Sequence, residues 1–396
     1  SAGGRHILRI YDVSEEKSMT SMPMDMNPAI ARKLKEIGDA FCIKGPFFSY
    51  EEIKMGNVNH TYKVNYIVDD GTGMAKIKSY LVQRVNTYAF QHPVELMQNI
   101  DRVTEHIRRE RPKNQSLHFH HTVDRKNYLM DDDGFWRLSN YVPSVTFDSC
   151  DDLDVVHSAG EAFGDFQMML SDFDAAQLFY TIPDFHDTRK RYAKLREDAQ
   201  ADPCGRVSEV REELDWLLSV EDEACKLTDL YNAGELPLRV THNDTKINNI
   251  LFDKQGEVLC AIDLDTVMAS TSLNDFGDAI RSYANTGDED DRDLSRVGIS
   301  PEMFSAYTDG YLSQRAAQLT ETEIGHLAFS ARYITFEQVL RFLMDYIDGD
   351  TYYKIKYPDH NLVRTHAQYR LLQSMEEHYG QMCRIVAGIA EHYRNA

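Results

Sequence analysis

Three polar residues follow one another closely in the second half of the chain, in the order His242, Asp244 and Asn249. A fourth, Asp263, comes directly after the apolar residues 258–262. A carboxylate beside a hydroxyl nucleophile can orient it and take its proton while the hydroxyl attacks phosphorus. Amide and carboxylate oxygens are hard ligands of the kind that Mg²⁺ prefers. These residue types favour phosphoryl-transfer chemistry, with Asp244 as the base and Asn249 and Asp263 as metal ligands.

A β-hairpin is predicted to bring these groups together. The two apolar runs, residues 249–252 and 258–262, are separated by a short charged segment that contains Gly256. The order H-x-D-x-x-x-x-N before such a hairpin is that of a kinase catalytic loop, in which His242 would hold the loop by hydrogen bonds. An Asp or Asn beside a strand is also ordinary turn chemistry, so only the ordered set with its hairpin is informative.

Length and charge limit the classes of partner. The chain has 396 residues, of which 42% are hydrophobic, so it can bury one large core or two coupled ones. Its formal net charge of -21 would repel nucleic acid and anionic membrane surfaces. A nucleotide could still bind through Mg²⁺ and a local basic patch. We therefore expect small-molecule partners, with no nucleic acid and no membrane.

The cysteines and the apolar runs indicate a cytoplasmic protein. The six cysteines are scattered without a C-x-x-C pair or the His spacing of a zinc site, which suits a reducing compartment. The same lack of further His ligands disfavours a metal hydrolase built on His242. No apolar run has the length of a membrane span, and the beginning of the chain lacks the pattern of a signal peptide.

The first third of the chain reads as a nucleotide-binding lobe. Residues 1–27 show no sustained periodicity and are expected to be a flexible tail. Residues 28–41 have the spacing of an amphipathic helix, and residues 47–138 are rich in strands and Gly-containing turns, so the lobe is expected to span residues 28–139. One turn could cover phosphates, although a plain hairpin turn fits it as well. Its residues are Gly56, Asn57, Val58 and Asn59.

The strand at residues 78–85 ends in Gln83 and Arg84, where a kinase strand carries the Lys that pairs with the phosphates. Side chains alternate along a strand, so only one of the two can point inward. We favour Gln83, because the apolar residues before it then keep their register. The helix that begins at Pro93 offers Glu95 as an ion-pair partner. A carboxylate placed beside the helix dipole is the simpler interpretation of Glu95.

Residues 140–149 are interpreted as the crossing between two domains, followed by a mainly helical region over residues 150–396. The backbone of Asn140, Tyr141 and Val142 could hydrogen-bond an adenine edge, although an ordinary linker fits the same residues. Helices are predicted over residues 155–171, 189–200 and 206–232, before the hairpin, and again from its end to the carboxyl terminus.

These features resemble the aminoglycoside phosphotransferase and choline kinase family. The amino-terminal strands, the crossing and the helical region with H-x-D-x-x-x-x-N and I-D-x-D carry the resemblance. Several blocks are similar to its N-acetylhexosamine 1-kinase branch, and they occupy residues 163–167, 185–188, 241–246, 262–266, 275–278 and 356–365. A Gln at position 83 departs from most kinases but matches this branch.

The resemblance implies an α+β, protein-kinase-like fold of two lobes. The first would be an antiparallel sheet with one packed helix, and the second a mainly helical lobe that holds the catalytic hairpin. It further implies ATP and Mg²⁺ as cofactors and transfer of the γ-phosphate to the anomeric hydroxyl of N-acetylglucosamine or N-acetylgalactosamine. Asp244 would face that hydroxyl, Arg341 and Tyr352 would hold the sugar, and Asp265 would support the catalytic loop.

Other functions remain open at this stage. An aminoglycoside or small-amine kinase of the same fold would suit the acidic composition, because its acceptor is a cation. A nucleotide-binding pseudokinase is the alternative from another class, and the presence of Asp244, Asn249 and Asp263 together speaks against it. Without the resemblance, Arg341 and Tyr352 would be read as ordinary residues of a helix surface.

Overall fold

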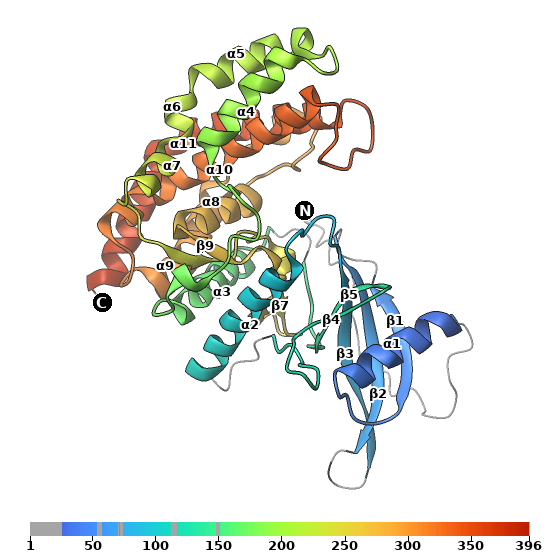
Figure 1. The fold of residues 1–396 in the computed structure, drawn as a ribbon. Coiled ribbons are helices and arrows are strands. Elements are labelled where there is room, and N and C mark those ends of the chain that lie inside the picture. Colours follow the sequence, from blue (N-terminus) through green and yellow to red (C-terminus); the bar gives the residue numbers. More distant parts are fainter. Residues whose placement is uncertain are drawn as a thin grey trace, which may run out of the picture.

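The computed structural model describes residues 26–53, 58–69, 71, 74–111, 117–147 and 151–395. It consists of a lobe built on a β-sheet and a larger helical lobe (Figure 1). The sheet has five antiparallel strands in the order β1-β2-β3-β5-β4. These strands are β1 (Phe47–Ile53), β2 (His60–Asp69), β3 (Ala75–Val85), β4 (Leu129–Asp131) and β5 (Gly134–Asn140).

Helix α1 (Pro28–Ala40) covers one face of the sheet because its apolar stripe matches that face. Asn27 caps the helix by accepting from the backbone N–H of Ala29, and Leu34 and Ile37 are buried on a sheet face that includes Val64 and Val82. Strand alternation leaves the opposite face polar. On it Asn65 donates to Ser49 Oγ at 2.9 Å and accepts from Ser79 Oγ at 2.7 Å.

Helix α2 (Pro93–Glu110) lies between the sheet and the helical lobe (Figure 1). Its buried residues Leu96, Ile100 and Val103 share a core with Phe166 of the helical lobe. Asn99 donates to the carbonyls of Phe179 and Val267 at 2.8 and 3.1 Å. The helix therefore joins the two lobes through an apolar core and through the hydrogen bonds of the Asn99 side chain to backbone carbonyls.

The helical lobe is centred on α10 (Glu321–Ile347), which begins with a capping box formed by Thr320 and Glu323. Helices α8 and α11 pack along α10, and α3 packs against α9. Besides α10, the α-helices of this lobe among the described residues are α3 (Leu153–Met169), α4 (Thr188–Ala201), α5 (Arg211–Ser219), α6 (Glu221–Ala224), α7 (Lys226–Asn232), α8 (Ser272–Tyr283), α9 (Pro301–Arg315) and α11 (His360–Asn395).

Two short antiparallel pairs lie where the helical lobe meets the sheet lobe. Strand β6 (Arg239–Thr241) pairs with β9 (Met268–Ser270), and β7 (Ile250–Phe252) pairs with β8 (Val258–Ala261). The second pair confirms the hairpin that the sequence predicted. Single-turn helices flank it, η3 (Ile247–Asn249) before β7 and η4 (Leu264–Thr266) after β8.

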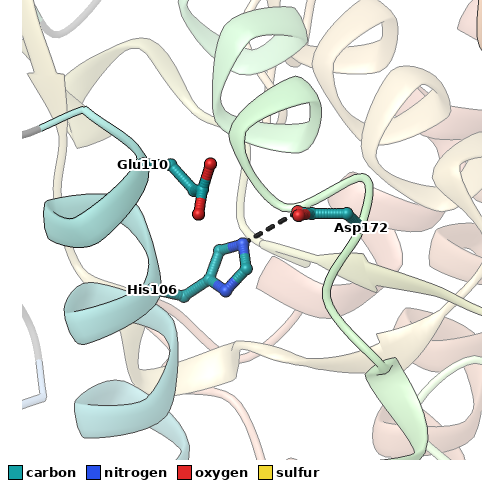
Figure 2. Close-up of side chains that lie close together, drawn as sticks. All are labelled: His106, Glu110 and Asp172. Atoms are coloured by element: carbon teal, nitrogen blue, oxygen red, sulfur yellow. Dashed lines mark hydrogen bonds and ion pairs between the residues drawn. The ribbon is translucent and has the colours of Figure 1, made fainter.

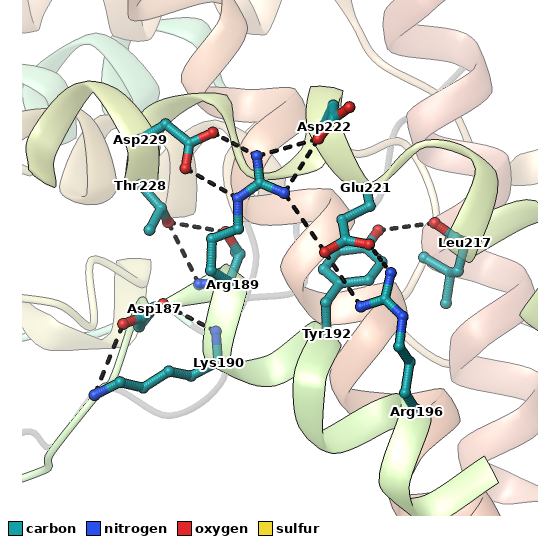
Figure 3. Close-up of polar contacts among 11 residues, drawn as sticks. Asp187, Arg189, Lys190, Tyr192, Arg196, Leu217, Glu221, Asp222, Thr228 and Asp229 are labelled. Atoms are coloured by element: carbon teal, nitrogen blue, oxygen red, sulfur yellow. Dashed lines mark hydrogen bonds and ion pairs between the residues drawn. The ribbon is translucent and has the colours of Figure 1, made fainter. Parts of the chain in front are cut away.

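The single helix predicted over residues 206–232 is wrong. The chain forms a 3-10 turn over Val207–Val210 and then α5, α6 and α7, with bends at Val220 and Cys225. The bends turn carboxylates toward α4 (Figure 3). Arg189 pairs there with Asp222 and Asp229 at 3.2 and 2.6 Å.

No helix among the described residues is long and apolar enough to cross a membrane.

Candidate functional site

A buried histidine, His242, holds the loop between β6 and η3 in place. His242 is fully buried, and its ring meets Phe163 and Phe166 edge-on at centroid distances of 5.3 and 5.5 Å. Its Nε2 lies 2.8 Å from the carbonyl oxygen of Ile262, which can only accept, so Nε2 donates. His242 thus ties the loop to the end of β8, the arrangement expected of a loop support.

Asp275 in the first turn of α8 fixes the loop from the other side. Its carboxylate accepts from the backbone N–H of His242 at 2.9 Å, from that of Asn243 at 2.7 Å and from Gln167 Nε2 at 2.8 Å. Burial raises the pKa of Asp275, while the hydrogen bonds and the nearby His242 act against that rise. Asn243 has a left-handed backbone with φ of 63°, so the loop depends on this support. Sequence reasoning did not assign this role to Asp275.

Both oxygens of the Asp244 carboxylate are positioned by neighbours. Asn249 Nδ2 donates to Oδ2 at 2.9 Å, and Lys246 Nζ lies 3.0 Å from Oδ1. Asp244 keeps part of its surface exposed, so a substrate hydroxyl can reach it. The structure therefore brings Asp244 and Asn249 together as expected. Lys246 was missed, although its place two residues after Asp244 in the same loop was a usable signal.

Asp263 follows β8 in a left-handed backbone conformation with φ of 58°. Its carboxylate is accessible to solvent but is surrounded by protein on most sides. Loss of hydration, followed by the charges of Asp265 and Asp244, raises the pKa of Asp263 to about 7, and Arg137 and Lys246 offset this only in part. A set of oxygen donors with excess negative charge fits a divalent cation such as Mg²⁺. The side-chain nitrogen of Asn249 donates to Asp244. The side-chain oxygen of Asn249 could therefore act as a second metal ligand.

Asp265 connects the site to the sheet lobe. It is 3% exposed and accepts from both terminal nitrogens of Arg137 on β5 and from Asn59 Nδ2 at 2.7 Å. Gln83 Oε1 accepts from Arg137 Nε at 2.9 Å. Gln83 therefore lies on the sheet face that is turned toward the helical lobe, whereas Arg84 lies over the ring of Trp136. A nucleotide contact of Gln83 remains a prediction.

Of the other residues expected to contact the nucleotide, some lie outside the described residues and the rest lie beside the sheet lobe or at its surface. Gly56 and Asn57 lie outside the described residues, and Val58 is exposed. Besides its bond to Asp265, Asn59 accepts from the backbone N–H of Asn86 at 2.9 Å. Glu95 lies 3.8 Å from His92, the residue just before α2, which favours the interpretation as a first-turn carboxylate.

Residues 140–142 line a hollow of about 1520 Å³ beside the first half of β3. Ser79 and Tyr80 lie on the same wall. The backbone N–H groups of Asn140 and Tyr141 already donate, to the carbonyls of His118 at 3.0 Å and Ser79 at 3.4 Å. Lys63 lies 4.5 Å above the ring of Tyr141. An adenine contact by the backbone of this segment stays a prediction, and these two N–H groups are already engaged.

The residues expected to hold the acceptor form one group, called here the arginine–aromatic cluster. Arg341 on α10 lies with its guanidinium 5.5–5.9 Å from three ring centroids. Tyr352, which is 72% exposed, is one of these rings, so the structure brings Arg341 and Tyr352 together. The complete cluster consists of Phe185, His186, Glu337, Arg341, Tyr352 and Tyr353.

Glu337 is the anion of the arginine–aromatic cluster. His186 Nδ1 lies 2.9 Å from its carboxylate, Arg191 Nε 3.5 Å and Arg341 Nη1 3.9 Å. Burial opposes ionisation of Glu337, but these groups together lower its pKa to about 2. Three buried atoms of the cluster, His186 Nε2, Glu337 Oε1 and Tyr353 Oη, have no hydrogen-bond partner among the described residues. Such atoms are suited to a polar ligand.

A row of charged residues runs from the catalytic loop to Glu289. Asp278 accepts from the backbone N–H of Thr245 at 3.0 Å and pairs with Arg281 at 3.2 Å. Arg281 also pairs with Glu289 at 2.8 Å. The charge of Glu289 is one of the influences that raise the pKa of Tyr353, after burial as the largest cause.

Comparisons with known proteins identify the family and the fold of this chain. Residues 49–317 match the sequence profile that describes APH, the phosphotransferase enzyme family. Aminoglycoside phosphotransferase from Alicyclobacillus acidocaldarius has a similar structure, with a TM-score of 0.55 and 12% sequence identity over 94% of this chain and 98% of that chain. Choline kinase from Cryptosporidium parvum has a TM-score of 0.50 and 14% identity over 86% and 93%. Identities this low show the fold alone, and they confirm the predicted two-lobe α+β class.

Proposed function

The chain belongs to the phosphotransferase enzyme family, and from its site we infer that it is an ATP-dependent kinase for the anomeric hydroxyl of an N-acetylhexosamine. It has the kinase-like fold of the aminoglycoside and choline kinases. Within that fold, the sequence blocks that resemble the N-acetylhexosamine 1-kinase branch support a sugar acceptor. The products would be the sugar 1-phosphate and ADP.

The catalytic loop supports the chemical step. Asp244 would accept a hydrogen bond from the acceptor hydroxyl and take its proton while the new oxygen–phosphorus bond forms. The contacts from Asn249 and Lys246 keep its carboxylate in one orientation, so no reorientation is needed during the reaction. Mg²⁺, held by Asn249 and Asp263, would supply charge neutralisation at the phosphates.

The position of Arg341 is the observation that favours a neutral acceptor over a cationic one. A choline-like or aminoglycoside acceptor needs open aromatic faces or unpaired carboxylates. In the arginine–aromatic cluster the rings of Phe185, Tyr352 and Tyr353 lie around the guanidinium, and Glu337 is neutralised by its own cations. A second cation there would meet repulsion. A sugar, with hydroxyl and amide oxygens, would be matched by the guanidinium and the phenol groups.

An acceptor panel tests this proposal. ADP release is measured with N-acetylhexosamines, hexoses, choline and kanamycin, and the product is checked for loss of its reducing end. We expect turnover on an N-acetylhexosamine and a product without a free reducing end. Turnover on choline or kanamycin alone would establish the amine-kinase alternative. ATP binding without turnover on any acceptor would establish a pseudokinase.

A pair of arginine variants tests the acceptor site itself. Arg341→Gln is expected to raise the KM for the sugar roughly 10- to 100-fold and to leave the KM for ATP unchanged, because a hydrogen bond to a charged group is worth a few kcal/mol. Arg292→Gln is the matched control, since Arg292 also lies over a tyrosine ring but is exposed and pairs with Asp359. Equal effects of the two variants on the sugar KM would contradict the assignment.

A further inference from the structure

A histidine and two carboxylates from both lobes converge at the end of α2, away from the catalytic loop. His106 and Glu110 lie one helical turn apart on α2, and Asp172 lies in the segment that follows α3 (Figure 2). One ligand atom from each of the three lies within 4.8 Å of the other two. Both carboxylates are turned toward the imidazole in the figure. The group therefore has its donors facing a common point.

The imidazole is the fixed part of this group. Its side chain is 12% exposed, and its ring meets Phe173 edge-on at a centroid distance of 5.3 Å. Nε2 lies 2.9 Å from Asp172 Oδ1, whereas Asp172 is 66% exposed and free to adjust. A cation at this point would need only small shifts of the two carboxylates, with an imidazole that is already oriented by packing.

We propose that His106, Glu110 and Asp172 form a binding site for a divalent transition-metal ion of the Zn²⁺ class. One imidazole nitrogen with two carboxylate oxygens is a donor set for Zn²⁺ or Co²⁺ rather than for Mg²⁺, which takes oxygen alone. Three protein ligands leave one position of a tetrahedral ion to water. Nothing in the proposed phosphoryl transfer uses this site.

A similar group of side chains around His157 lacks this convergence. His157 on α3 also has a carboxylate one turn later, Glu161, and a partner across the helix interface, Asp309. There the two carboxylates approach different nitrogens, Glu161 near Nδ1 at 3.8 Å and Asp309 near Nε2 at 3.0 Å. A single ion cannot use both edges of one ring. Among the described residues, the three-atom convergence occurs only at His106.

The bound ion would fasten α2 to the helical lobe. His106 and Glu110 belong to α2, which joins the sheet lobe to the active-site region through the contact of Asn99 with Val267, whereas Asp172 belongs to the helical lobe. Metal binding should therefore stabilise the folded state, because an ion that binds only the native arrangement adds its binding free energy. We expect a structural ion and no change in the acceptor that is used.

Cobalt titration of the full chain, stripped of metal with a chelator, tests the site. Bound Co²⁺ is followed by its visible absorption, and Zn²⁺ affinity by competition. The background is Asp263→Asn in excess Mg²⁺, so that the predicted catalytic metal site contributes nothing. We expect one saturable Co²⁺ site that Zn²⁺ displaces, and a rise in Tm on addition of Zn²⁺.

Three variants in the same background decide the outcome. His106→Gln should weaken Zn²⁺ binding by about 100-fold or more, because it removes the nitrogen ligand, and Glu110→Gln should weaken it in the same direction. His157→Gln, the matched control, should bind as the parent does. Circular dichroism of the metal-free variants checks that each is folded. Absence of a saturable site in the parent, or equal binding by His106→Gln and His157→Gln, would overturn the proposal.

Discussion

Arg137 of β5 and Asp265 of η4 form a two-point ion pair that joins the sheet lobe to the helical lobe. Both side chains are 3% exposed, and the Arg137 Nη2 to Asp265 Oδ2 distance is 3.1 Å. A guanidinium and a carboxylate that face each other with two parallel hydrogen bonds are held in direction as well as in distance. Since Asp265 is two residues from Asp263, the pair fixes the end of the catalytic hairpin relative to the sheet.

The effects of removing Arg137 and Asp265 on the free energy of unfolding should not be additive. Arg137→Met leaves Asp265 as an uncompensated buried charge, so we expect the free energy of unfolding to fall by about 3–5 kcal/mol. Arg137→Met combined with Asp265→Leu should cost less than the sum of the single variants, as measured by urea unfolding in a double-mutant cycle. Lys35→Met is the control, because Lys35 and Asp39 form an exposed pair worth less than about 1 kcal/mol. Strictly additive effects would show that the pair is not coupled.

Asp244→Asn should abolish most turnover without loss of nucleotide binding. Asn keeps the shape of the side chain but cannot take a proton, so we expect kcat to fall by about 100- to 10,000-fold. Measured by calorimetry, ATP affinity should change little. Asp253→Asn is the control in the same hairpin, because the Asp253 carboxylate accepts from the turn N–H groups of Gln255 and Glu257. Near-normal kcat in Asp244→Asn would refute the assignment of the base.

The parts of the site that could be predicted from the sequence are those set by short spacing. Asp244, Asn249 and the β7–β8 hairpin lie within a few residues of each other, so turn chemistry and strand length fix their arrangement. The register of the apolar residues before Gln83 favoured Gln83 over Arg84 on the face toward the helical lobe, and Gln83 bonds Arg137 on that face.

The remaining contacts join residues that are far apart in the chain. Periodicity identifies which face of an element is buried but does not say which distant partner covers it. The bond of Asp275 to the catalytic loop, the pairing of Glu337 with His186 and the reach of Arg137 to Asp265 are all of this kind. The bends at Val220 and Cys225 were missed for the same reason, because Arg189 on α4, which pairs with the carboxylates of α6 and α7, is far from them in the chain.

Acid should weaken the fold through Glu337. Its folded pKa of about 2 is below the model-peptide value of about 4.5, so the unfolded chain binds the proton first. The contribution of its ion pairs is present above pH ~4.5 and is lost as the pH falls toward 2, by on the order of 2 kcal/mol between pH 6 and pH 3. Urea unfolding of the wild type and Glu337→Gln at both pH values measures this.

The same linkage between protonation and folding gives the expected change in stability for Glu337→Gln. Glutamine cannot be protonated in this range, so the variant should be less stable than the wild type at pH 6, and the difference should shrink at pH 3. The exposed Glu377, which pairs with Arg370 near the surface of α11, provides Glu377→Gln as a control with little effect at either pH. A stability difference for Glu337→Gln that stays constant with pH would contradict the low pKa.

Gly277 lets α8 approach α10 closely enough to place Asp275 against the backbone of the catalytic loop. A Cβ at this position would lie 2.3 Å from the carbonyl oxygen of Ser330 and 2.8 Å from Ile334 Cγ1, so Gly277→Ala must push the two helices apart. We expect a loss of about 1–3 kcal/mol in the free energy of unfolding. Because Asp275 is two residues away and holds the backbone of His242 and Asn243, kcat should fall as well.

Gly325→Ala is the matched control for this prediction. Gly325 is exposed on α10, and a Cβ there would meet nothing within 4 Å. Alanine at such a helical position should raise the free energy of unfolding by about 0.5–1 kcal/mol and leave kcat unchanged. If Gly277→Ala lowers the free energy of unfolding while Gly325→Ala raises it, the loss at Gly277 comes from the contact between α8 and α10 and not from helix propensity. If Gly277→Ala were as stable and as active as the wild type, the close approach of α8 and α10 would not position the catalytic loop.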